Sequence, residues 1–317
     1  MAHIAIVTPA RAGTRNGNRH TAQRWAAHLR AAGHRVSVGT AWDGRPCDLL
    51  LALHAHRSHP SIVAYRKRFP SAPLVVALTG TDLYRDLPAS RKAQQSLAFA
   101  DLIVTLQSEA GKELERKFRA KVRVVYQSSD ASVRQAAPKD RFRVAVVGHL
   151  REEKDPFRAA LALSHLKQNL EVVQVGDALS PEFSIQARKL MKRDARYRWL
   201  GGRSHRGALG WIARSHALVV SSRMEGGANV ICEAARIGTP VLASRISGNI
   251  GMLGRNYPGY FPTFDEKALG RLMQKILAKK PYQMLKRALA ARRHLFLPSA
   301  ERAALTAVIR EALRRTA

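Results

Sequence analysis

The chain has 317 residues, with 54 Lys and Arg against 23 Asp and Glu, and a formal net charge of +31 at pH 7. Its length suits roughly two domains of about 150 residues each, and no apolar run approaches the ~20 residues that cross a bilayer. The two cysteines, Cys47 and Cys232, are far apart and lack metal-ligand spacing, which excludes a disulfide framework and a zinc site and favours a reducing, cytoplasmic compartment.

So large a positive charge predicts an anionic partner. The basic residues are spread along the chain, and aromatic residues make up only 6% of it, without the aromatic-basic stripe that stacks single-stranded bases. We therefore expect no specific nucleic acid and no membrane contact, and look for a small anionic ligand.

The first half of the chain alternates short apolar runs with amphipathic stretches, a pattern typical of a parallel sheet wound with helices. The clearest helix is Arg19–Ala32, which has Trp25, Ala26 and Leu29 on one face and Gly33 as its end. The predicted strands are Ile4–Thr8, Val36–Gly39, Leu49–Leu53, Leu74–Leu78, Leu102–Leu106 and Val122–Tyr126.

A segment rich in Ser, Gln and Ala, Gln127–Lys139, reads as a linker, because a second alternating series begins directly after it. We therefore predict an N-terminal Rossmann-like domain at 1–135, a second at 141–297, and a C-terminal helix at 298–317 that can cross back onto the first. The second series contains the predicted strands Phe142–Val147, Leu170–Val175, Trp199–Leu200, Ala217–Val220 and Val241–Ala243.

Ligands of open parallel sheets bind beyond the carboxyl ends of the strands, so two such domains facing each other would enclose a cleft. After the strand Phe142–Val147 come Gly148, Arg151 and Lys154. Two cations beside a strand end suit a diphosphate. We expect a helix to start at Asp155-Pro156.

A stronger motif follows the strand Ala217–Val220. The loop carries Gly226 and Gly227, and a helix is predicted to start near Ala228 or Asn229, so that its free N–H groups can receive a phosphate. Glu225 and Glu233 stand eight residues apart around that helix start, and both could face one nucleotide-sugar.

The third candidate region, from Gly13 to Thr21, leads into the first helix and could form an anion nest on the acceptor side of the cleft. Segments after two further strands would face the same cleft. The candidate acceptor-binding residues are Gly17, Asn18, Arg19, His20, Thr21, His54, Arg57, Thr81 and Asp82. His56 is a further candidate for acid, base or phosphate contact.

The "G-x-L-x-x-x-K" loop at Gly148 and the E-x7-E element at Glu225 resemble those of family 4 glycosyltransferases of the GT-B fold. The resemblance implies that Arg151 and Lys154 bind the donor diphosphate, that Glu233 binds the ribose, and that Glu225 lies by the transferred sugar, so we expect Arg151, Lys154 and Glu225 to be catalytic. It also assigns donor contacts to Gly148, Gly202, Arg203, Gly226, Gly227, Ala228 and Asn229. GT-B enzymes need no metal, and we expect no cofactor.

Three runs in the first half, "GNR-x-TA-x-RWA-x-x-L" at Gly17, "LLLALHA" at Leu49 and "LTGTDLYRDL" at Leu78, resemble the selenosugar synthase family of selenoneine biosynthesis. That family implies a UDP-sugar donor, chiefly UDP-N-acetylglucosamine, selenophosphate as the acceptor and a selenosugar as the product. The chain departs from family 4 in having Thr79-Gly80-Thr81-Asp82 where many members carry a His, and in having Gly17-Asn18-Arg19 in place of a Gly-Gly acceptor loop. Retention at the anomeric carbon is therefore left open.

The sequence thus predicts a metal-independent, selenosugar-forming glycosyltransferase. Three alternatives remain open at this stage. The chain could be a conventional family 4 glycosyltransferase acting on a lipid or small alcohol, a nucleotide-sugar epimerase on the same fold, or, in a different class, a basic nucleic-acid-binding protein.

Overall fold

The computed structural model describes residues 1–9, 17–167 and 169–315, and the chain divides into two compact units. Unit 1 comprises Met1–Gln127 together with Pro298–Ala317, and unit 2 comprises Ser128–Leu297. The C-terminal helix therefore belongs to the same unit as the N-terminus.

Unit 1 is a six-stranded sheet in the order β2-β1-β3-β4-β5-β6, and each of its neighbouring pairs is parallel. Its strands are β1 (His3–Val7), β2 (Arg35–Gly39), β3 (Leu49–Leu53), β4 (Leu74–Leu78), β5 (Leu102–Thr105) and β6 (Val122–Val124). Its helices are α1 (Gly17–Ala31), α2 (His59–Arg68), α3 (Arg91–Phe99), α4 (Arg116–Arg119) and α12 (Pro298–Arg314).

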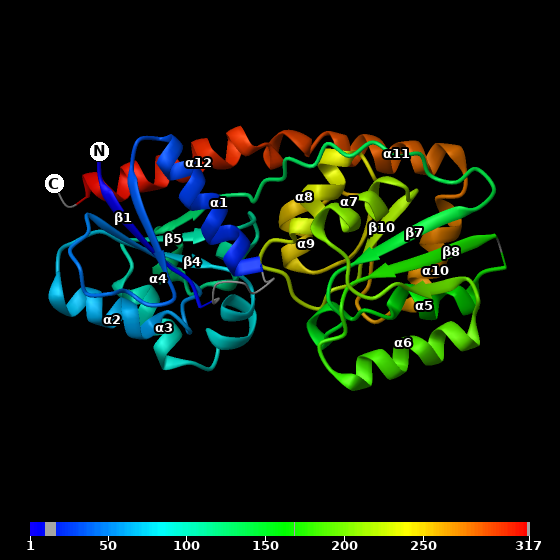
Figure 1. The fold of residues 1–317 in the computed structure, drawn as a ribbon, viewed down its shortest axis with the longest axis horizontal. Coiled ribbons are helices and arrows are strands. Elements are labelled where there is room, and N and C mark those ends of the chain that lie inside the picture. The colour runs from blue at the N-terminus through cyan, green and yellow to red at the C-terminus, as the bar shows by residue number, and fades with distance from the viewer. Residues whose placement is uncertain (10–16, 168, 316–317) are drawn as a thin grey trace. The chain divides into compact units, whose positions relative to one another are not determined.

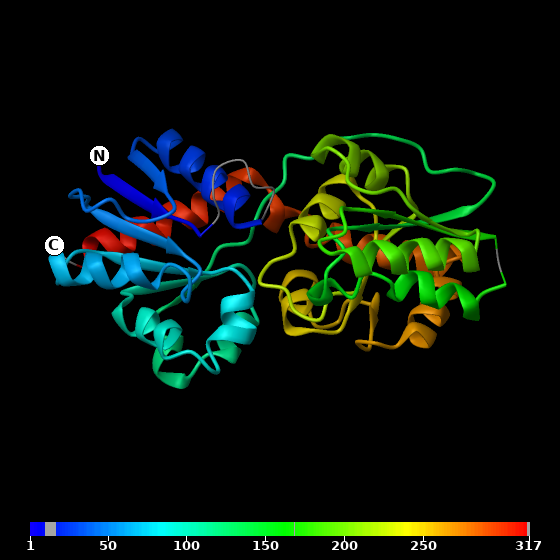
Figure 2. The same cartoon turned by 60° about the horizontal axis from the view of Figure 1, so that its bottom comes forward.

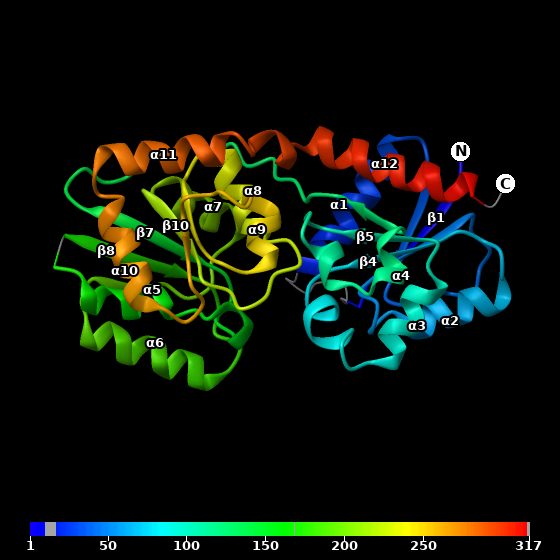
Figure 3. The same ribbon diagram turned by 180° about the vertical axis from the view of Figure 1, so that it is seen from behind.

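Helices cover both faces of this sheet, which is why its central strands are apolar at every position. On one face, Trp25 and Leu29 of α1 pack with Ile309 of α12. On the other, Tyr65 of α2 and Leu97 of α3 are buried. In Figure 1, α1 and α12 lie above the sheet and α2 and α3 below it; Figure 3 gives the reverse view, and Figure 2 shows the strands, blue to cyan, side by side.

Unit 2 repeats this plan with the parallel order β12-β11-β10-β7-β8-β9. Its strands are β7 (Phe142–Val147), β8 (Leu170–Val175), β9 (Tyr197–Trp199), β10 (Ala217–Val220), β11 (Val241–Ser244) and β12 (Tyr260–Phe261). Its helices are α5 (Arg158–Ala162), α6 (Pro181–Arg193), α7 (His205–Ala213), α8 (Asn229–Ile237), α9 (Ser247–Leu253), α10 (Glu266–Lys275) and α11 (Lys279–Ala290). In Figure 1, α7, α8 and α11 lie above this sheet and α5, α6 and α10 below it.

The two parallel sheets expected from the sequence are confirmed, and five strands have the predicted bounds. The prediction of a helix start at Asp155-Pro156 is wrong. A single 3-10 turn spans Glu152–Lys154, Asp155 follows it in a left-handed conformation (φ 42°), and α5 begins only at Arg158. The Asp155 carboxylate accepts hydrogen bonds from the Arg158 guanidinium instead of capping a helix. The two-residue strand β12 was not expected, because so short a run carries no periodicity.

A buried carboxylate fastens α12 to α1. Glu301, 1% exposed, accepts hydrogen bonds from Arg24 Nε and Trp25 Nε1, each at 2.7 Å. Since burial of an unpaired carboxylate is costly, these donors are needed for α12 to pack here.

We predict that Glu301→Ala lowers the free energy of unfolding by about 2–4 kcal/mol, because it leaves the Trp25 N–H and the Arg24 charge without their acceptor. The matched control is Glu311→Ala on the same helix. Glu311 pairs with Arg123 while 32% exposed, so its loss should cost less than about 1 kcal/mol. Urea denaturation of both variants measures the difference, and equal losses would contradict the assignment.

Candidate functional site

Three neighbouring strands of unit 2, β10, β7 and β8, end at one edge of the sheet. The loops that follow them carry most of the residues that the sequence singled out. A pocket at this edge is lined by residues of β7, β8 and β10, by Gly148 and His149, and by Lys154, Ser222 and Glu225. Such an edge is where open parallel sheets bind ligands.

Glycines let the loops approach each other here. Gly148 has a φ of 152°, a backbone conformation that side chains rarely adopt. A Cβ added to Gly176, at the end of β8, would lie 1.9 Å from the carbonyl oxygen of Gly148. The loops after β7 and β8 are thus in direct backbone contact, which fixes the start of the segment that carries Arg151 and Lys154.

An ion pair joins the two motifs predicted to hold the donor. Lys154 Nζ lies 2.5 Å from Glu225 Oε1, and Ser222 Oγ donates to the same oxygen at 2.6 Å. The Glu225 residue is only 8% exposed. The lysine and glutamate are 71 residues apart in the chain, so only the folded sheet brings them together, and the pair places a partly exposed cation at the strand ends.

Several buried polar atoms around this pair have no hydrogen-bond partner among the described residues. Buried polar atoms are normally hydrogen-bonded, and a bound ligand or a water would satisfy them. They are His149 Nδ1, Arg151 Nε, Gln174 Nε2 and Asn229 Oδ1. Arg151 also lies 3.8 Å from a Glu153 carboxylate oxygen, and it remains 43% exposed. The edge therefore offers both donors and an acceptor to a polar ligand.

Helix α8 begins at Asn229 as expected, with Ala228 as its N-cap and no side-chain cap. Gly226, Gly227 and Ala228 form the turn before it, and the positive end of the helix dipole lies at that turn. An anionic group is thus favoured next to the Lys154–Glu225 pair.

Glu233, on α8, accepts a hydrogen bond from His205 Nε2 at 2.9 Å. His205 is the first residue of α7, which Ser204 caps through the Gly207 N–H. The hydrogen bond to Glu233 raises the pKa of His205, and the charge of Asp130 acts in the same direction. The carboxylate predicted to bind ribose is therefore already held by a neighbour.

Gly202 and Arg203 precede α7. A Cβ on Gly202 would lie 2.0 Å from Asp177 Oδ1, so a larger residue at this position would displace the exposed Asp177 side chain. Arg203 is exposed, and its guanidinium donates to the Gly202 carbonyl oxygen. That Gly202 and Arg203 contact the donor stays a prediction.

The candidate acceptor residues all lie in unit 1. Gly17, Asn18, Arg19 and His20 form the first turn of α1, whereas the rest of the predicted nest, Gly13 to Asn16, lies outside the described residues. Thr21 is 1% exposed, and its hydroxyl donates to the Gly17 carbonyl oxygen and accepts from Gln127 Nε2. In this structure Thr21 supports the helix start instead of facing solvent.

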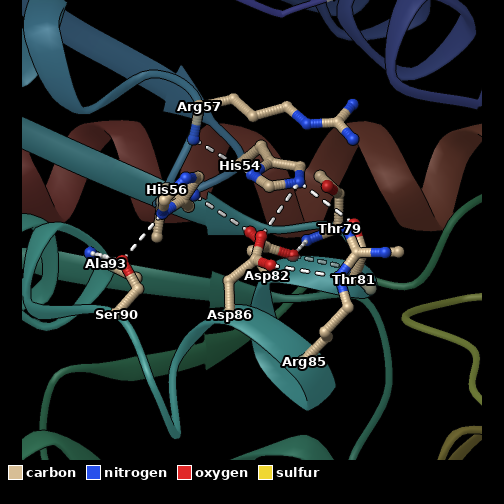
Figure 4. A network of polar contacts seen from close by, with 12 residues as sticks. His54, His56, Arg57, Thr79, Thr81, Asp82, Arg85, Asp86, Ser90 and Ala93 are labelled. Atoms are coloured by element: carbon tan, nitrogen blue, oxygen red, sulfur yellow. Dashed lines mark hydrogen bonds and ion pairs between the residues drawn. The ribbon is translucent and has the colours of Figure 1, made fainter.

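Figure 4 shows the other acceptor candidates at the ends of β3 and β4. Asp82 is fully buried, and its carboxylate accepts the backbone N–H groups of Ala55, Thr79 and Gly80. It organises the two loops and does not reach the surface. His54 is buried and bonded to Thr81, while Arg57 is exposed.

The sequence-based donor set lacked His149, Gln174, His205 and Ser222, which the structure brings to the candidate donor residues. His205 lies 28 residues before Glu233, and no local motif signals that they meet. Gln174 lies in a strand, where the sequence pattern indicates a structural side chain and not an amide that faces a ligand.

Within the described part of the chain, no group of three or more His, Cys, Asp or Glu residues could hold a metal. Among the described helices, none combines the length and the apolar composition of a membrane span.

Comparison with known proteins gives one family match and many similar folds. The family described as "Glycosyl transferases group 1" matches residues 128–293. HepE from Anabaena, solved in complex with UDP, is 16% identical with a TM-score of 0.77, and the match covers 98% of this chain and 100% of HepE. Another HepE structure is a complex with UDP-glucose.

Sucrose-phosphate synthase from Thermosynechococcus elongatus is 17% identical with a TM-score of 0.82, and the match covers 99% of this chain and 100% of the synthase. At such identities the likeness shows the fold alone. That fold is GT-B, as the sequence predicted.

The His205–Glu233 contact predicts a pH-dependent stability. The pKa of His205 is raised in the folded state. The contact with Glu233 therefore gives its full contribution to the free energy of unfolding at pH values below 6.5, the ordinary pKa, and this contribution is lost as pH rises through the raised pKa. The contribution should stay below about 1 kcal/mol, since the side chain is 62% exposed.

We therefore expect the stability difference between wild type and His205→Gln to be largest near pH 6 and to shrink toward pH 8.5. Urea unfolding across this range measures it. A difference that is constant with pH, or that grows with pH, would contradict the assignment.

Proposed function

The chain belongs to the group 1 glycosyltransferases, and from this premise we propose that it transfers N-acetylglucosamine from UDP-N-acetylglucosamine to selenophosphate. The residues predicted to bind the donor belong to unit 2, and those predicted to bind the acceptor belong to unit 1. The observation that best supports a UDP-sugar site in unit 2 is the Lys154–Glu225 pair beside the start of α8.

In the proposed reaction, the selenium of selenophosphate attacks the anomeric carbon of the donor. A carbon–selenium bond forms, the bond from that carbon to the β-phosphate oxygen breaks, and its electron pair leaves with UDP. Negative charge grows on the diphosphate as the bond breaks, so cations that contact it stabilise the transition state more than the bound substrate.

Three features of unit 2 support this role for Lys154 and Arg151. Lys154 is held at the strand ends by Glu225, Arg151 has a buried Nε without a hydrogen-bond partner among the described residues, and the α8 dipole adds positive potential. Glu225 would meet the sugar and Glu233 the ribose, as the family resemblance implies. The complexes of HepE with UDP and UDP-glucose support a UDP-sugar as the donor.

Two features support selenophosphate as the acceptor. They are the motifs in the first half of the chain that resemble selenosugar synthases, and the exposed cations of unit 1. A small, highly charged acceptor needs no long apolar groove. A conventional glycosyltransferase with a lipid or alcohol acceptor is the competing outcome.

The direct assay mixes the protein with UDP-N-acetylglucosamine and selenophosphate and measures UDP release together with the mass of the sugar product. We expect UDP and a selenium-containing sugar in equal amounts. Release no faster than without selenophosphate would overturn the acceptor assignment while leaving the donor site intact, and UDP-glucose in parallel tests the choice of sugar.

Lys154→Ala should lower kcat on the order of 10²–10³-fold, because it removes a cation that meets the developing charge. The control, Lys112→Ala, removes a lysine that pairs with Glu109 on the surface of unit 1, and we expect it to leave kcat unchanged. An unaltered kcat in Lys154→Ala would mean that the diphosphate binds elsewhere.

We also propose that the reaction needs no divalent metal, since Arg151, Lys154 and the α8 start would neutralise the diphosphate. Turnover in excess EDTA should equal turnover in added Mg²⁺. Activity that disappears with the chelator and returns with Mg²⁺ would refute this part of the proposal.

A further inference from the structure

His54 has an unusual position at the end of β3. It is 1% exposed and has a φ of 74°, a left-handed conformation that non-glycine residues seldom adopt. Such a conformation persists only where the surroundings enforce it, and it is often found at functional sites. Here its backbone N–H donates to the Ala77 carbonyl oxygen at 2.8 Å, which ties the end of β3 to the neighbouring β4.

The hydrogen bonds of the ring define its tautomer. The backbone N–H of Arg57 donates to His54 Nδ1 at 3.3 Å, so Nδ1 is an acceptor and carries no proton. Burial lowers the pKa of His54 as the main cause, with the Arg57 charge acting in the same direction and Asp82 opposing. A neutral imidazole must then carry its proton on Nε2.

Nε2 lies 3.1 Å from Thr81 Oγ1. Because Nε2 carries the proton, it donates and the Thr81 oxygen accepts. The Thr81 hydroxyl proton is thereby directed away from the ring, available to a ligand. A hydroxyl can both donate and accept a hydrogen bond. Because the Thr81 oxygen already accepts from the imidazole, its O–H group is left to donate to a ligand.

The charges around Thr81 are arranged with the cations outward. Arg57 is exposed, whereas Asp86 is mostly buried, with its Oδ2 3.8 Å from His54 Nε2. Asp82 is buried under three backbone N–H donors, and Asp86 is bonded to Arg85 Nε at 3.2 Å. In Figure 4 the Arg57 side chain extends over the His54 ring. The exposed charges at this sheet edge are therefore the guanidinium groups of Arg57 and Arg85, while the carboxylates of Asp82 and Asp86 are buried or nearly so.

We propose that His54 is a positioning residue that presents the Thr81 hydroxyl as a hydrogen-bond donor to an oxyanion bound with Arg57. The proposal rests on the proposed function in placing the acceptor in unit 1, and it narrows the acceptor to a phosphoryl-type anion. It also replaces the expectation that His54 itself touches the acceptor, because the buried ring acts through Thr81.

The test measures binding of inorganic phosphate by calorimetry to protein saturated with UDP, so that the donor site is already filled. Thr81→Val, which keeps the side-chain shape, should weaken phosphate binding about 10- to 100-fold, the usual effect of losing a hydrogen bond to a charged group. Thr81→Ser keeps the hydroxyl and should restore most of the affinity. Equal affinities in wild type and Thr81→Val would overturn the proposal.

A second pair of variants isolates the imidazole. His54→Gln keeps an N–H donor, whereas His54→Met has a similar length without one, and both face the same left-handed backbone. We expect His54→Met to weaken phosphate binding more than His54→Gln, with urea unfolding as the control for the folding of unit 1 and unchanged UDP affinity as the control for unit 2.

The double variant His54→Met/Thr81→Val should bind phosphate no more weakly than Thr81→Val alone, since His54 acts through Thr81. Losses of phosphate affinity that add up in the double variant would show that His54 has only a structural role, and would overturn the proposal. Because no turnover is measured, phosphate binding that obeys these rules without selenophosphate-dependent UDP release would uphold this inference and reject only the proposed acceptor.

Discussion

The contact between Lys154 and Glu225 connects the two loops on which the proposed donor site of unit 2 depends. The Glu225 carboxylate is buried and is stable there because the Lys154 ammonium and the Ser222 hydroxyl both donate to it. The parallel sheet supplies this arrangement, because β7 and β10 are neighbours and their loops emerge at one edge. In the proposed reaction the same lysine serves the departing diphosphate.

The two units place different chemistry at their sheet edges. Unit 2 gathers cations, a helix start and buried polar atoms without partners among the described residues, which suit a large, charged donor. Unit 1 gathers a buried histidine, a threonine and an exposed arginine, which suit a small anion. The net charge of +31 fits an enzyme whose proposed substrates are all anionic.

Much of the fold could be predicted because buried parallel strands are continuous apolar runs; Leu49–Leu53 and Phe142–Val147 were found with their observed bounds. The start of α8 was also predicted, because the paired glycines Gly226 and Gly227 precede a helix with apolar residues. The left-handed turn at Asp155 was missed, because a local Asp-Pro signal was overridden by the 3-10 turn before it. The partners of Glu233 and Thr81 come from distant segments, and only the packed sheet brings His205 and His54 to them.

The most direct test of the central claim, that the strand ends of unit 2 hold the diphosphate, is amide hydrogen exchange with and without UDP. We expect slower exchange in residues 148–154 and 225–233 when UDP is bound, because these loops and the α8 start would contact the nucleotide. Protection confined to other segments, with these two unchanged, would contradict it.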